Sequence, residues 1–194
     1  MATTKHTTDV LRGYIQDLLA VHRHTAEAMK RHADDDALDT VPGAADLVRE
    51  TVSMLENHLH DLQTLLGVTG GQGPVGQVKE AVTAVTGFIT GIYGQARTDT
   101  APRMLRDDAT SIHFIQVCTG MLHTTALAFK DDATARVTSE MIKHHAPIAV
   151  RFGEIVPHAV QADLAKDYAV VDANAADRAV RVLQEAWQSA SAHG

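Results

Sequence analysis

The sequence has a single cysteine, Cys118, and few aromatic residues, which make up 4% of the chain. One thiol excludes an internal disulfide and a zinc site built from several cysteines. A core with so few rings must be filled by aliphatic and small side chains. Long runs of lysine and arginine are also absent, and the formal net charge is -7. This charge excludes a protein that tracks a nucleic-acid backbone and opposes binding to an acidic membrane surface.

Long hydrophobic runs are missing as well. The N-terminal stretch MATTKHTTDVLRG lacks the apolar segment of a signal peptide. The stretch VTAVTGFITGIYG is apolar but too short, and too rich in threonine and glycine, to span a bilayer. We therefore expect a cytoplasmic protein with no membrane partner.

Helical periodicity is present throughout, and no stretch alternates with the period of a strand. Apolar residues recur at helical spacing over five long segments, which are 8–33, 44–66, 75–97, 102–129 and 133–155. Two shorter helices are expected at 158–168 and 173–190. Pro147 predicts a kink near His144, and Pro157 predicts the start of a new helix.

These segments predict an all-α fold built as a bundle of four long helices. Segment 75–97 would be a helical crossover between the second and third members of the bundle. We expect one domain over 1–160 and a C-terminal helical extension, 161–194, packed on it.

Histidine is abundant, with twelve residues in the chain. In segment 102–129, His113, Gln116, Gly120 and His123 lie at i, i+3, i+7 and i+10, which places them on one stripe of a helix. The stripe interrupts an otherwise apolar segment. We expect His113, Gln116 and His123 to point into the bundle.

The other long helices also carry histidine on their apolar faces. His22 shares the face of the first helix with five other residues, Leu11, Ile15, Leu18, Thr25 and Met29. His58 lies on the face of the second helix. In the last long helix, His144 or His145 lies beside a face formed by Met141, Ile148 and Phe152.

Convergence of imidazoles from several helices predicts a metal site, because neutral histidine is the commonest metal ligand and bundle interiors are where such sites form. The candidate ligands are His22, His58, His113, Gln116, Glu140 and His144. Glu140 is the best-placed carboxylate, four residues before His144. The alternative is a polar core in which each histidine is bonded to a carbonyl, a threonine or water. The metal would be Zn, Cu, Fe or Mn, or none would bind.

Two stretches resemble the ferritin-like superfamily. HLHDLQTLLG is similar to the second-helix segment of bacterial stress-type ferritin-like proteins, and MLHTTALAFKDDATARVTSEMIKHHAPIAVRFGEIVPHAV is similar to the paired third and fourth helices of another ferritin-like branch. The resemblance implies a ferritin-like four-helix bundle. Diiron members carry Glu-x-x-His on two helices, but that motif is absent from the four long helices, and His113 or Gln116 occupies the third-helix acidic position.

These departures favour a bundle that has lost its diiron carboxylate site and acts as a non-catalytic scaffold or stress-related protein. The alternative is a histidine-rich metal-binding protein with storage or oxidase activity. A second apolar face on the 102–129 helix needs cover from the crossover, from the C-terminal helix bearing Trp187 or from another subunit, so we expect a homodimer. Its residues are Phe114, Val117, Met121 and Thr124.

Overall fold

The computed structural model describes residues 2–69 and 100–192. This part of the chain is helical and contains no strand, which confirms the all-α prediction. Its elements are α1 (Ala2–Ala33), the 3-10 helix η1 (Asp36–Thr40), α2 (Ala44–Val68), α4 (Ala101–Phe129), α5 (Asp132–Asp167) and α6 (Ala175–Ala192). The expected crossover helix at 75–97 lies outside the described residues.

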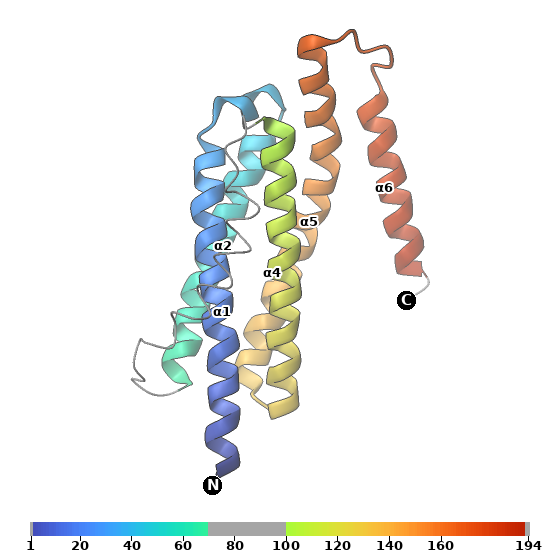
Figure 1. Cartoon of the computed structure of the whole chain (residues 1–194). Helices are drawn as coiled ribbons and strands as arrows, with labels where there is room; N and C mark the ends of the chain where they lie inside the picture. The colour runs from blue at the N-terminus through green and yellow to red at the C-terminus, as the bar shows by residue number, and fades with distance from the viewer. Residues whose placement is uncertain (1, 70–99, 193–194) are drawn as a thin grey trace.

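The four long helices lie side by side and form a ring of contacts (Figure 1). α1 packs against α2 and α4, and α5 packs against the same two helices from the other side. α1 and α2 run in opposite directions, as do α4 and α5, whereas α2 and α4 run in the same direction (Figure 1). The end of α2 and the start of α4 therefore lie at opposite ends of the bundle.

A tight turn joins α4 to α5. Lys130 ends α4 with a positive φ of 55°, in the left-handed region that closes many helices. Asp131 then caps α5, because its carboxylate accepts a hydrogen bond of 2.9 Å from the backbone N–H of Thr134. This turn fixes α4 and α5 as an antiparallel pair.

The expected start of a new helix at Pro157 is wrong, because α5 continues through Pro147 and Pro157 to Asp167. An internal proline removes one backbone hydrogen bond and strains the preceding turn. Burial of Phe152 and Ala159, on either side of Pro157, offsets that cost. The second half of α5 extends past the N-terminal end of α4 (Figure 1), and the domain boundary expected at 160 falls inside this helix.

Helix α6 packs against α5 through Trp187 of α6 and through hydrogen bonds made by Gln161 of α5. The indole ring of Trp187 lies over Gly153, where a Cβ atom would be 2.5 Å from the ring. The Gln161 amide donates to the carbonyl of Ala173 and accepts from the N–H of Ala176. These contacts hold α6 on the second half of α5.

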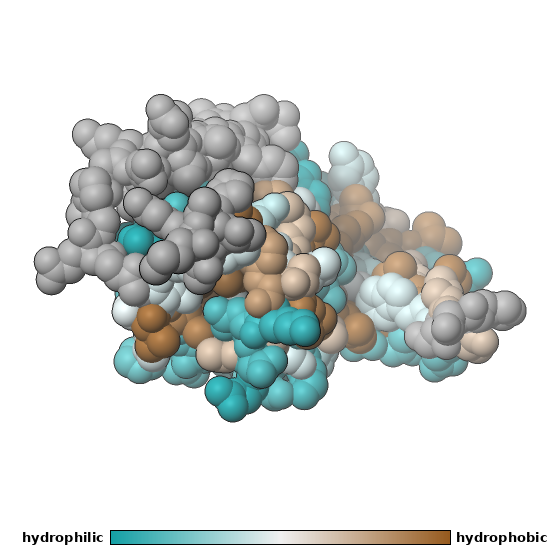
Figure 2. All heavy atoms as spheres, turned by 90° about the horizontal axis from the view of Figure 1, so that it is seen from below, coloured by the Kyte–Doolittle hydropathy of each residue, from teal (hydrophilic) through white to brown (hydrophobic). Residues whose placement is uncertain are grey.

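Much of α4 faces outward and is apolar. Val117 and Met121 are 63% and 48% exposed, and Trp187 covers Gly153 on α5 instead of this face. Figure 2 shows apolar residues mixed with polar ones on the end of the molecule seen from below. Among the described residues, α4 has the length and apolar composition to cross a membrane, a test that core helices of soluble proteins also pass.

The buried apolar residues form two clusters along the length of the bundle. One cluster includes Leu55, Ile115 and Phe152, and the other includes Leu18 and Leu62. Between them the inner faces of the helices carry polar residues, which are His22, His58, Thr119 and His145. The core is therefore divided by a polar layer.

Substitution by alanine is expected to have opposite effects at Gly153 and Gly120. We expect Gly153→Ala to push Trp187 away and loosen α6, at a cost of about 1–3 kcal/mol of overpacking. Gly120→Ala should instead stabilise α4 by about 0.5–1 kcal/mol, because nothing lies within 4 Å of its Cβ position and alanine is the better helix former.

Fluorescence of Trp187, the only tryptophan in the chain, measures the first effect, and thermal unfolding measures both. A Gly153→Ala protein with unchanged emission and unchanged stability would contradict the packing of Trp187 on Gly153.

Candidate metal centre

Three buried imidazoles from three helices converge in the polar layer. His22 of α1, His58 of α2 and His145 of α5 each offer one ring nitrogen, and these nitrogens lie within 4.8 Å of one another. The exposed fractions are 0% for His22, 2% for His58 and 0% for His145. The cluster is closed to solvent within the described structure.

Helical spacing places each imidazole on the inner face. His22 stands four residues after Leu18, His58 four before Leu62, and both leucines belong to the same apolar cluster. His145 follows Met141 of that cluster by four residues and precedes Ile148 of the other by three. The three histidines therefore occupy one level of the bundle.

The ring planes of the three histidines are inclined to one another instead of being stacked in parallel. The centroids of His58 and His145 are 4.9 Å apart with an interplanar angle of 86°. The His22 ring is 5.7 Å from that of His58 and 5.8 Å from that of His145, at 63° and 48°. This arrangement brings one nitrogen of each ring within 4.8 Å of the other two.

Hydrogen bonds satisfy only some of the ring nitrogens of the cluster. The Nδ1–H of His22 donates to the carbonyl of Leu18 at 2.8 Å, and the Nε2 of His58 lies 3.1 Å from the Nδ1 of His144. The remaining nitrogens have no partner among the described residues, and these are Nε2 of His22, Nδ1 of His58 and both ring nitrogens of His145. Unpaired buried polar atoms are costly.

Burial keeps all three imidazoles neutral. Desolvation lowers the pKa of His22 to about 4, although its bond to the Leu18 carbonyl opposes the shift. Desolvation, reinforced by the neighbouring imidazoles, lowers the pKa of His58 to about 3 and that of His145 to about 2. At neutral pH each ring therefore keeps a lone pair that a metal can accept.

The donor set suits a small transition-metal ion. Zn–N bonds of about 2.0–2.1 Å in a tetrahedral site put the nitrogens roughly 3.3 Å apart. Nitrogens already within 4.8 Å of one another need only a small inward movement to reach that spacing. Imidazole donors without carboxylates suit Zn and Cu.

Two of the six sequence-predicted ligands, His22 and His58, lie in the cluster. His144 is exposed and contacts the outer edge of His58. Glu140 is exposed and paired with Lys143 at 2.7 Å. The α5 residue in the cluster is therefore His145, which is not one of the six predicted ligands.

The expected inward stripe of α4 lies one residue away from the observed inner face. His113 is exposed and Gln116 is half-buried, whereas Ile112, Ile115 and Thr119 are buried. Isoleucine gains more than histidine or glutamine from burial, and that difference rotates the helix by one position. The expectation that His113 points inward is wrong.

His123 lies at another level and has a partner. The hydroxyl of Thr138 donates to the carbonyl of Thr134, so the Nδ1–H of His123 donates to the Thr138 oxygen at 2.9 Å. This histidine links α4 to α5 and does not join the cluster.

His145 is the ligand candidate that the predicted set omits in favour of His144. Its signal is present in the sequence, since Met141, His145, Ile148 and Phe152 follow one another at spacings of four, three and four. All four are buried. Continuing the apolar face of α5 through the histidine pair therefore selects His145.

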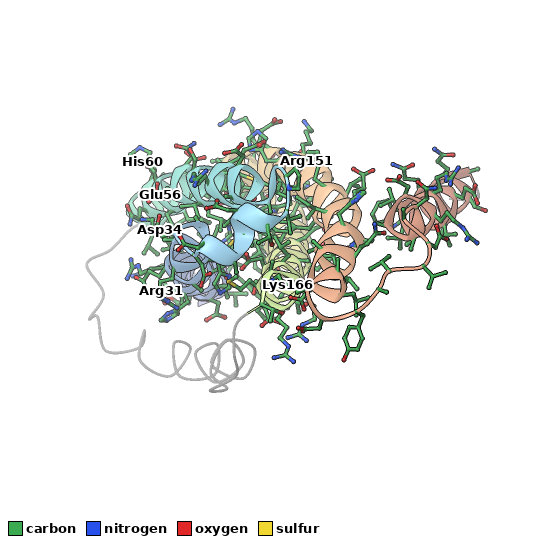
Figure 3. All side chains as sticks on the ribbon, turned by 90° about the horizontal axis from the view of Figure 1, so that it is seen from above. Arg31, Asp34, Glu56, His60, Arg151 and Lys166 are labelled. Carbon is green, nitrogen blue, oxygen red and sulfur yellow. The ribbon has the colours of Figure 1, made fainter. Side chains whose placement is uncertain are left out.

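A cavity of about 430 Å³ opens beside the cluster, between α2 and α5. His58 and His144 line it, but His22 and His145 do not. Arg151 sits at its edge, where α5 faces α2 (Figure 3), and bonds Glu50 at 2.7 Å. Glu56 and His60 point away from the core on the outer side of α2 (Figure 3). The cavity reaches His58 from outside the cluster.

The lowered pKa values predict a strong acid sensitivity of the metal-free protein. The unfolded chain protonates these histidines near their ordinary pKa of 6.5, whereas the folded chain stays neutral down to about pH 4. Stability should therefore fall as pH drops from 6.5 to 4, by about 1.4 kcal/mol per pH unit for each histidine.

Thermal unfolding in chelator across this pH range measures the slope. His145→Leu removes one of the protons taken up on unfolding and should make the dependence shallower, whereas the exposed His113→Leu should leave it unchanged. Equal slopes in His145→Leu and the parent protein would contradict the lowered pKa of His145.

Comparisons of the chain with models of protein families, with curated proteins and with solved structures give no match. The geometry of the histidine cluster therefore carries the functional argument.

Proposed function

We propose that this protein is a helical-bundle metal-binding protein that holds one Zn or Cu ion at His22, His58 and His145. One observation carries the proposal: in a buried layer each of the three rings offers one nitrogen within 4.8 Å of the other two, and each ring has at least one nitrogen with no hydrogen-bond partner among the described residues. Metal coordination would satisfy these nitrogens and offset the cost of burying them.

His123 supplies the contrast with a purely structural histidine. It is part-buried and has a threonine partner at 2.9 Å. If the polar core were the remnant of a lost metal site, its histidines would be expected to have hydrogen-bond partners, as His123 does. His145 has no such partner on either nitrogen, although Thr residues are frequent on the neighbouring helices. This difference favours the metal-binding alternative over the scaffold.

The carboxylates support a metal other than dioxygen-activating iron. Diiron sites in bundles use carboxylates that bridge two ions. Here Glu140 faces outward to Lys143, and Glu50 bonds Arg151 on the surface. A site of imidazoles alone fits Zn or Cu.

The arrangement of the helices supports a ferritin-like four-helix bundle as the fold. α2 and α4 run in the same direction (Figure 1), as the second and third helices do in ferritin-like bundles, which have one long crossover. In this proposal the bundle keeps the ferritin-like position of the metal centre, inside the helices, but replaces its ligands by histidine.

The site supports holding a metal more than turnover at it. Catalytic zinc sites keep one coordination position open to substrate. The cavity between α2 and α5 reaches His58 but neither of the other two ligands, so the ion would lie behind His58. Storage or structural stabilisation follows from such a closed site.

Titration with Co²⁺ as a spectroscopic substitute, and with Zn²⁺ in competition, tests the proposal. We expect one equivalent to bind and to raise the melting temperature. Each of His22→Leu, His58→Leu and His145→Leu should weaken binding by more than about 100-fold, beyond the cost of losing an outer-shell group. His113→Leu is the matched control, because His113 is exposed on α4.

Elemental analysis of protein purified without an affinity tag or chelator completes the test. No bound metal, together with unchanged or higher stability in the three leucine variants, would refute the metal centre and leave a metal-free scaffold.

A further inference from the structure

His144 contacts the outer edge of a proposed metal ligand without joining the cluster. Its Nδ1 lies 3.1 Å from the Nε2 of His58, and the two rings are nearly parallel, with an interplanar angle of 11° and centroids 5.4 Å apart. We propose that His144 is a positioning residue that holds the proton of His58 on Nε2 and so leaves the lone pair on its buried Nδ1 for the metal. This inference rests on the proposed metal centre.

A neutral imidazole carries its proton on one nitrogen and its lone pair on the other. His58 can bind a metal only through the nitrogen without the proton. Its Nδ1 is buried and has no hydrogen-bond partner, whereas its Nε2 faces His144. Metal binding through Nδ1 therefore needs the proton on Nε2 and an acceptor beside it, which is the Nδ1 of His144.

His22 shows the same arrangement with a backbone acceptor. Its Nδ1–H donates to the carbonyl of Leu18, which leaves the lone pair on Nε2. Metal-bound histidines usually donate their second N–H to such a partner, which orients the ring and raises its basicity. Leu18 and His144 thus play equivalent parts for two ligands, and the donor set combines Nε2 of His22 with Nδ1 of His58.

The position of His144 on α5 explains how one helix supplies two functions. His144 and His145 are consecutive, so they project from the helix about 100° apart. His145 points into the polar layer, and His144 lines the cavity between α2 and α5 beside His58. The HH pair in the sequence therefore contributes one ligand and one residue that orients another ligand.

The charged groups around His144 bond to one another. Lys143 bonds Glu140 and Arg151 bonds Glu50, each at 2.7 Å, and Asp61 also lines the cavity. The bond between His144 and His58 joins two imidazoles. The role assigned to His144 is that of a hydrogen-bond acceptor, and an uncharged acceptor of similar reach should replace it.

Two substitutions of His144 distinguish its role as a hydrogen-bond acceptor from the effect of its size. His144→Gln keeps an acceptor oxygen at this position, whereas His144→Phe keeps a ring but has no acceptor. In metal-free protein at pH 7.5, ¹⁵N NMR of the His58 ring should show the proton on Nε2 in the parent chain and in His144→Gln. In His144→Phe the Nε2–H form should lose its preference. His60→Phe, on the exposed side of α2, is the control.

Affinity for Co²⁺ provides the second measurement. His144→Phe should bind about 10–100-fold more weakly than the parent chain, as expected for loss of an outer-shell partner, and His144→Gln should stay within a few-fold of it. Retention of the Nε2–H form and of full affinity in His144→Phe would overturn the inference, as would equal losses in His144→Gln and His144→Phe. Because the tautomer is read without metal, a parent chain that binds no Co²⁺ would refute the metal centre separately from the role of His144.

Discussion

The structure depends on a polar layer buried between two apolar clusters. An apolar bundle of this length could have filled that level with leucine, and doing so would have spared the desolvation of three imidazoles. The chain instead places one histidine there on each of α1, α2 and α5, with Thr119 on α4. The hydroxyl of Thr119 donates to the carbonyl of Ile115, but the three histidines, whose rings lie together, keep nitrogens with no partner among the described residues. The cost of this layer is the physical reason to assign it a ligand.

The arrangement of the four helices explains why three of them contribute a histidine to this layer and α4 does not. α1 and α5 lie across the bundle from each other, and both contact α2 and α4. Histidines on α1, α2 and α5 can therefore meet at the centre, while α4 closes the fourth side with a small side chain. Apolar clusters on both sides keep water from the layer, which lowers the pKa of each imidazole and preserves its lone pair.

Sequence periodicity was sufficient to predict the buried residues of a helix where only one face was apolar. On α1 the predicted residues from Leu11 to Met29, His22 among them, are all buried, and on α2 His58 lies inside as expected. On α4 it was insufficient, because apolar residues surround much of that helix and two adjacent stripes fit the same spacing. Burial of Ile112 and Ile115 decided between them and turned His113 to the surface. The continuation of α5 through Pro157 was likewise set by packing on both sides of the proline.

The sequence by itself determined that the protein is helical, that its core is aliphatic and that histidines lie on the inner faces of two helices. These properties follow from periodicity and composition, which can be read from each segment of the chain without knowing which helices it contacts. Only the tertiary structure decided which histidines meet, because three helices had to be aligned to within one residue along their axes. It also decided that His145 faces the cluster and that His144 bonds the outer edge of His58. A rotation of 100° separates neighbouring residues on a helix, and the choice between them is made by contacts with the other helices.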